Sequence, residues 1–181
     1  MDLGNEIKQI KSYNEAFESK IKSILNDEFV VRFISKPSSS PEYLFQIEKS
    51  DDSQRKLHTL ILHENLWRSK NRDSVKVHSY KRDFNCEISN QLDQLFKIAT
   101  DSTKFKRIFS INGEDGTFYY FIRQTSISDM NCGMVWSPPK ASTLRELVAI
   151  CEEIIRYGTG ENVKIELISE KINILSLRLK Y

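Results

Sequence analysis

The side chains most suited to chemistry are three histidines, His58, His63 and His78, gathered in one short region of the chain. His58 and His63 lie five positions apart, which places them on opposite faces of a strand, whereas His58 and His78 would meet if neighbouring strands paired there. Zinc sites usually combine histidine with cysteine or carboxylate ligands at short fixed spacings, and no such spacing occurs here. The sequence therefore predicts structural or solvent-facing histidines, with no metal site and no cofactor.

The second candidate chemistry is that of a reactive cysteine. Cys86 opens a predicted helix, where the helix dipole favours the thiolate. A nucleophile also needs a base, and the spacing of the cysteines and histidines identifies no such pair. Cys132 and Cys151 lie on apolar faces of predicted elements, which is typical of buried thiols. We therefore expect no catalytic residue and interpret the chain as a non-enzyme, with an enzyme assembled from distant loops as an alternative.

The clearest anomaly of composition is a basic segment between Arg55 and Arg82. It holds eight basic residues against two acidic ones, although the whole chain has a net charge of only +2. Trp67 and Tyr80 are interleaved with these charges. The segment is therefore the first place to look for a binding surface. Its basic residues are Arg55, Lys56, Arg68, Lys70, Arg72, Lys76, Lys81 and Arg82, and its acidic ones are Glu64 and Asp73.

Three interpretations of this segment stay open. Charged runs are most often the solvated face of ordinary structure. Arginine and tryptophan are also favoured anchors in protein interfaces, so the segment would suit the docking of a protein with an acidic surface. Basic residues beside an aromatic ring can also track nucleic acid, although no known nucleic-acid-binding motif accompanies them. The candidate partner-binding residues are Trp67, Arg68, Lys70, Arg72, Lys76 and Tyr80.

Strands and amphipathic helices must position these residues. Two runs rich in aromatic and β-branched residues, 105–111 and 117–125, flank a turn at 112–116 and predict a hairpin. Residues 118–122 are all apolar or aromatic, which predicts a strand covered on both faces in the middle of a sheet. Periodicity predicts the remaining elements: helices at 3–25, 86–100 and 143–157, and strands at 28–35, 43–47, 57–62, 75–80, 130–136, 162–168 and 172–180.

The first predicted helix carries a heptad-like apolar seam about three repeats long. Such a seam either pairs two chains, with Asn14 fixing the register, or lies on the sheet of its own domain. Three heptads are short for an isolated coiled coil, so we favour packing on the sheet. The apolar residues of the seam are Ile7, Ile10, Phe17, Ile21 and Ile24.

Length and composition place the chain among single-domain globular proteins. Its 181 residues fit one domain spanning 1–181, and 39% hydrophobic with 29% charged residues is ordinary for a soluble protein. We expect no membrane span and no secretory signal, and three cysteines without a CxxC pair favour reduced thiols in the cytoplasm. The element order predicts an α+β fold: a largely antiparallel β-sheet with three helices, in the order α-ββββ-α-βββ-α-ββ.

A small α+β chain with a charge-polarised surface and no catalytic constellation is typical of proteins that bind other proteins. In general build, and through no particular motif, it is similar to the bacterial immunity proteins that neutralise toxins. That likeness implies a cytosolic inhibitor whose partner is a toxin protein. We therefore expect a protein-binding module with a partner of acidic surface, and nucleic-acid binding through the basic segment 55–82 is the alternative.

Overall fold

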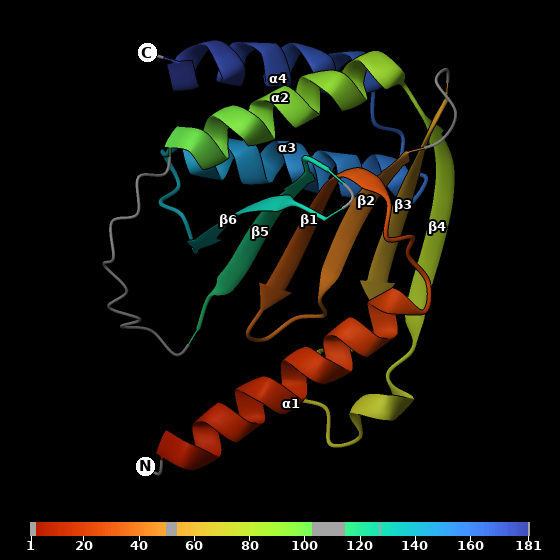
Figure 1. Ribbon diagram of the computed structural model, residues 1–181, viewed down its shortest axis with the longest axis vertical. Coiled ribbons are helices and arrows are strands. Elements are labelled where there is room, and N and C mark those ends of the chain that lie inside the picture. Colours follow the sequence, from red (N-terminus) through yellow and green to blue (C-terminus); the bar gives the residue numbers. More distant parts are fainter. Residues whose placement is uncertain (1–2, 50–53, 103–114, 127, 181) are drawn as a thin grey trace.

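The computed structural model describes residues 3–49, 54–102, 115–126 and 128–180, which form one open sheet with helices on both faces (Figure 1). All neighbouring strands are antiparallel, in the order β4-β3-β2-β1-β5-β6. The elements are α1 (Leu3–Lys22), β1 (Phe29–Pro37), β2 (Tyr43–Lys49), β3 (Arg55–Leu62), the 3₁₀ turn η1 (Arg72–Ser74), β4 (Val77–Phe84), α2 (Cys86–Ser102), β5 (Thr117–Gln124), β6 (Met130–Trp136), α3 (Thr143–Gly158) and α4 (Ile165–Lys180).

The α+β fold and the antiparallel sheet are confirmed, but the described residues form four helices rather than three. The two strands predicted at 162–168 and 172–180 are wrong, because this segment is the single helix α4. Its fully buried residues, Ile168, Ile172 and Leu175, recur at helical spacing, whereas Leu167 is half exposed. The alternation at 163–167 covers too few residues to distinguish a strand from one turn and a half of helix.

The predicted hairpin between 105–111 and 117–125 is also wrong. β5 already pairs with β1 along one edge and with β6 along the other, so that Phe121 lies between Phe33 and Gly133. A strand has only two edges, and none is left for a further partner. Residues 105–111 and most of the turn predicted at 112–116 lie outside the described residues. β5 is therefore second from the edge of the sheet rather than in its middle.

The main core lies between the sheet and the layer of α2 and α3, with α4 packed on the outer side of these two helices (Figure 1). Phe33 stands at its centre, with ring contacts of 5.7 Å to Phe45 and 5.4 Å to Phe121. Phe96 of α2 meets the Phe121 ring edge-on at 5.4 Å. These aromatic contacts fix α2 over β1 and β5.

A smaller core lies on the opposite face, where α1 packs (Figure 1). Tyr13, Phe17 and Ile21 are buried at helical spacing against the sheet, so the prediction that this helix lies on its own domain is confirmed. Ile10 is half exposed, and Asn14 accepts a hydrogen bond from Lys36 Nζ at 3.1 Å. No helix of the described residues is long and apolar enough to cross a membrane.

Candidate functional site

Five of the six predicted partner-binding residues lie in the loop between β3 and β4. Asn65 ties this loop to the turn between β1 and β2, because its amide donates to Pro37 O at 3.0 Å and to Ser40 O. Arg68 Nε adds a bond to Ser38 O at 2.9 Å. The loop is therefore held against the sheet by its own polar side chains.

Trp67 and Arg72 attach the same loop to α1. Trp67 is 39% exposed, and its ring meets the Tyr13 ring edge-on at 5.2 Å. The Arg72 guanidinium lies 5.9 Å from both rings and donates to Ser12 Oγ at 3.0 Å. Both side chains therefore contact partners within the chain. Such contacts are consistent with the interpretation of the basic segment as a solvated face of the fold.

The remaining predicted residues do not complete one patch. Lys70 is exposed within the loop, and Lys76 is exposed at its root, just before β4. Tyr80 lies four positions further along the strand, about 13 Å away, and its partner in β3 is Thr59. The structure thus brings Trp67, Arg68 and Arg72 together and leaves Tyr80 apart. Whether any of the six contacts a partner stays a prediction.

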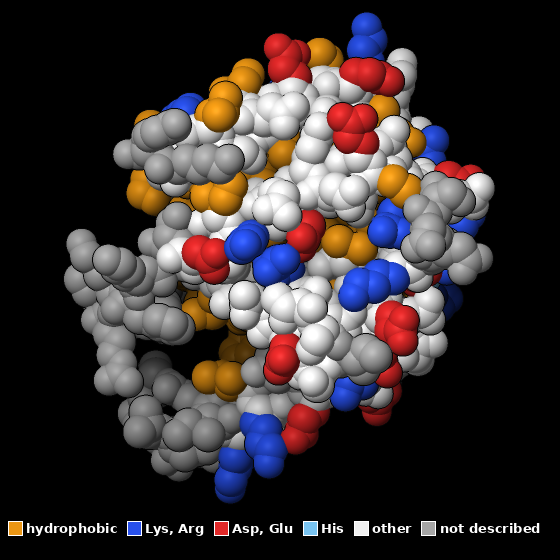
Figure 2. Space-filling model, turned by 45° about the horizontal axis from the view of Figure 1, so that its top comes forward, with side chains coloured by type: hydrophobic (Ala, Val, Ile, Leu, Met, Phe, Trp, Pro, Cys, Tyr) orange, Lys and Arg blue, Asp and Glu red, His pale blue; other side chains and the backbone are white. Residues whose placement is uncertain are grey.

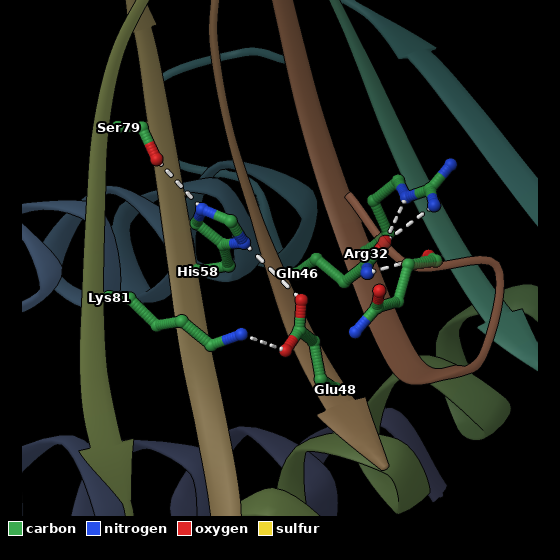
Figure 3. Close-up of polar contacts among 7 residues, drawn as sticks. Arg32, Gln46, Glu48, His58, Ser79 and Lys81 are labelled. Carbon is green, nitrogen blue, oxygen red and sulfur yellow. Dashed lines mark hydrogen bonds and ion pairs between the residues drawn. The ribbon is translucent and has the colours of Figure 1, made fainter. Parts of the chain in front are cut away.

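A buried polar chain crosses three strands on the α1 face (Figure 3). Glu48 of β2 and His58 of β3 are buried, while Ser79 of β4 is exposed. His58 Nδ1 lies 3.3 Å from Glu48 Oε1, and His58 Nε2 lies 2.8 Å from Ser79 Oγ. Lys81 Nζ reaches the other Glu48 oxygen at 2.6 Å. Beside this chain, the Arg32 side chain donates to Gln46, whose amide donates to Asn26 O at 2.9 Å.

The order of carboxylate, imidazole and hydroxyl in this chain is that of a serine-hydrolase relay. Burial by itself raises the pKa of Glu48, but hydrogen bonds from Lys81 and His58 outweigh burial and hold that pKa below the ordinary value. Glu48 is therefore ionised at neutral pH, and its carboxylate is contacted by both the Lys81 ammonium group and the His58 imidazole. The arrangement therefore supplies a buried carboxylate with hydrogen-bond and ion-pair partners.

The histidines meet in a different pair from the predicted one. His58 and His78 do not contact each other, because the residue of β4 that pairs with His58 is Lys81 and not His78. Instead His63 Nδ1 lies 3.4 Å from His78 Nε2, with both residues exposed. The described residues contain no group of three or more side chains suited to holding a metal ion.

Among the described residues, the core under α1 takes its buried sheet residues from β1, β2 and β3, includes Tyr120 and Ile122 of β5 only in part, and includes no residue of β6. The sheet residues buried under α1, such as Ile34, Leu44 and Leu60, come from the first three strands. Over β6, by contrast, Met130 is 60% and Met134 41% exposed. On this side the register places Trp136, Met134 and Cys132 of β6 opposite apolar or aromatic residues of β5, and Met130 opposite Gln124. This surface, called the open face below, consists of Phe118, Tyr120, Ile122, Met130, Cys132, Met134 and Trp136.

The side of α1 next to the open face is hollowed. A shallow hollow of about 490 Å³ runs along the side of α1 that carries Ile10, Asn14 and Glu18. This side points toward β5, because Asn14 binds Lys36, whose Nζ lies 5.5 Å from the Tyr120 ring. The hollow is lined by α1 side chains alone, and the open face lies beside it on the same side of the sheet. The hollow and the open face together are called the groove below, with α1 as its wall and the open face as its floor.

The floor of this groove carries no charge at neutral pH. Partial burial raises the pKa of the Tyr120 hydroxyl, so this group stays protonated. The other members of the open face are cysteine, methionine, isoleucine, phenylalanine and tryptophan. At the far end, the Phe118 and Trp136 rings lie 4.3 Å apart and form a compact aromatic pair.

A second apolar surface lies on the outer side of α4. Leu167 and Ile174 are each 51% exposed, and Leu177 is 59% exposed. Figure 2 shows apolar side chains near the C-terminal end of α4 and, across the same view, Lys and Arg interspersed with Asp and Glu. This surface is a single helix stripe, narrower than the two strands of the open face.

Sequence reasoning missed both the polar chain and the open face. The signal for the polar chain was a histidine inside the apolar run of β3, since a buried imidazole needs a partner. The signal for the open face was the run at 118–122. It predicts two covered faces, but Tyr119 and Phe121 are buried whereas Phe118, Tyr120 and Ile122 are only half buried.

Comparison of this chain with protein-family models finds no matching family, and comparison with curated proteins and with solved structures likewise finds no match.

Proposed function

We propose that this chain is a protein-binding module that seats an amphipathic helix of a partner protein in the groove between α1 and the open face. The observation that supports the proposal most strongly is the exposure of Met130 and Met134 on a two-strand surface without a charged side chain. Contiguous exposed apolar surface of this kind is typical of protein interaction sites.

The dimensions of the open face favour a helix as the occupant. Two strands about 4.8 Å apart, with their flanking space, give a strip about 10 Å wide, which is the diameter of a helix. β6 has seven residues, so the strip is about 24 Å long and matches about 16 helical residues. α1 already packs on the same face in this manner, with Tyr13 and Phe17 directed at the sheet. The partner helix would lie beside α1 as a second helix on that face.

The apolar floor and the polar wall of the groove determine which side chains a partner helix must present. Because the floor is uncharged, the partner helix must present an apolar stripe toward β5 and β6. Met130 and Met134 can adapt their shape to such a stripe, as methionines do at binding surfaces. Polar groups of the partner would face the α1 wall, where Asn14 and Glu18 are exposed.

Affinity capture from native lysate with matched variants tests this proposal. Met134→Lys places a charge in the floor of the groove, whereas Leu177→Lys places one on the exposed stripe of α4. We expect a stoichiometric partner that survives nuclease treatment and is retained by wild type and Leu177→Lys but lost by Met134→Lys. Retention by Met134→Lys with loss by a Lys70→Glu/Lys76→Glu variant would move the binding surface to the basic loop. Loss on nuclease treatment would favour nucleic acid instead.

The finer form of the proposal is an inhibitor of the immunity type, whose partner is a toxin. It predicts that the captured protein loses its own activity when bound. A partner that stays fully active in the complex would contradict this form while leaving the binding module intact.

The polar chain favours an enzyme as the second candidate function. Ser79 Oγ, His58 and Glu48 contact one another in the order required for proton transfer from a nucleophilic hydroxyl. A fluorophosphonate probe would then label Ser79 in wild type, and Ser79→Ala would abolish the labelling. No labelling above the Ser79→Ala background would remove this candidate.

A further inference from the structure

His63 and His78 come together because the β3–β4 ladder extends one pair beyond β3. The His63 N–H donates to Lys76 O at 2.9 Å, which places His63 opposite Lys76 and diagonal to His78 on one face of the hairpin. Their ring centroids are 5.6 Å apart, with the planes inclined by 50°. Two imidazole nitrogens, Nδ1 of His63 and Nε2 of His78, therefore face each other at the exposed root of the loop.

The separation of these nitrogens is that of two ligands on one cation. Two nitrogens bound to a tetrahedral zinc ion at about 2.0 to 2.1 Å lie about 3.3 to 3.4 Å apart. The observed Nδ1–Nε2 distance is 3.4 Å. We propose that His63 and His78 form a surface site for a divalent cation of the kind that imidazole prefers, Zn²⁺, Cu²⁺ or Ni²⁺.

The surroundings set the character of this site. Since the described residues hold no third protein ligand for a metal, the remaining coordination positions are open to water or to a donor group from another molecule. Lys76 is the charged residue directly opposite His63 on the same face, and its ammonium group opposes cation binding. The site is therefore weaker than a structural zinc centre with four protein ligands. This inference does not depend on the groove beside α1.

The test is a titration of the whole chain with ZnCl₂ and, separately, NiCl₂ at neutral pH, followed by calorimetry and by NMR of the histidine side chains. We expect one ion per chain, with changes in the His63 and His78 signals and none in those of buried His58. His63→Gln and His78→Gln should each weaken binding at least about tenfold, because one ligand of two is lost.

Lys76→Gln should tighten binding, because it removes the opposing charge without removing a ligand. Unchanged affinity in His63→Gln and His78→Gln would overturn the proposal, since the ion would then be bound elsewhere. The absence of any histidine signal change at millimolar zinc or nickel would overturn it as well.

Discussion

Removal of the Lys81 ammonium should destabilise the protein more than removal of the Glu48 charge that it neutralises. The two side chains differ in exposure: Glu48 is 5% exposed, whereas Lys81 is 48% exposed. In Lys81→Met, the buried carboxylate keeps only the contact from His58 Nδ1 at 3.3 Å. In Glu48→Gln, the ammonium group left behind can turn toward water.

The magnitudes follow from this asymmetry. Leaving a buried charge without its partner costs about 3 to 5 kcal/mol. Because His58 still contacts Glu48, we expect Lys81→Met to cost less than that, about 2 kcal/mol. An exposed cation that loses its partner costs about 1 kcal/mol or less, which sets the expectation for Glu48→Gln. Urea unfolding followed by tryptophan fluorescence measures both free energies of unfolding.

The pH dependence gives a sharper version of the same test. The folded-state pKa of Glu48 is lowered, so its ion pair contributes stability that is full above the ordinary glutamate range, about 4 to 4.5, and is lost as the pH falls through the folded value. In Lys81→Met, burial dominates instead, and protonation of Glu48 relieves the unpaired charge. The deficit of Lys81→Met should therefore shrink in acid. A deficit that is equal at neutral and acid pH, or smaller than that of Glu48→Gln at neutral pH, would refute this reasoning.

Three further predictions test the fold by thermal or urea unfolding. Ile168→Lys should cost more than about 3 kcal/mol while Leu167→Lys stays within about 0.5 kcal/mol, because Ile168 is buried whereas the neighbouring Leu167 is half exposed; similar costs would contradict the helix. Gly158→Ala should cost about 1 to 3 kcal/mol despite the better helix propensity of alanine, because its Cβ would meet Thr59 Oγ1 at 2.0 Å. Much of that cost should disappear in a Thr59→Ala background, and a stabilising Gly158→Ala would contradict the close packing of α3 on β3. Met134→Lys should leave the free energy of unfolding within about 0.5 kcal/mol of wild type, and a large loss would mean that the open face is covered within the chain.

Local patterns predicted most elements of the fold. The strands at 28–35 and 43–47 and the helices at 86–100 and 143–157 correspond to β1, β2, α2 and α3. Side chains next to the helices also mark where they start: Asn85 accepts hydrogen bonds from two N–H groups at the start of α2, and Ser142 caps α3. These features depend on residues within a few positions of one another.

Long-range pairing is the part that local patterns do not contain. The apolar run at 118–122 indicates a strand, but only the register with Phe33 and Gly133 shows which neighbours it has. The same limit applies to the candidate sites, since His63 meets His78, and His58 meets Glu48, only through the order of β2, β3 and β4. Spacing along the chain therefore drew attention to the histidines but predicted contact between His58 and His78, whereas His63 is the residue that meets His78.

The most direct test of the groove beside α1 is photo-crosslinking from position 134. A benzophenone amino acid in place of Met134 would report what lies on the open face, and the same group in place of Leu177 would serve as the control on α4. We predict crosslinks from position 134, mapped by mass spectrometry to an amphipathic helical segment of one partner protein, and none of comparable yield from position 177. Crosslinks from position 177 alone, or crosslinks from position 134 only to a second copy of this chain, would contradict the proposed binding mode.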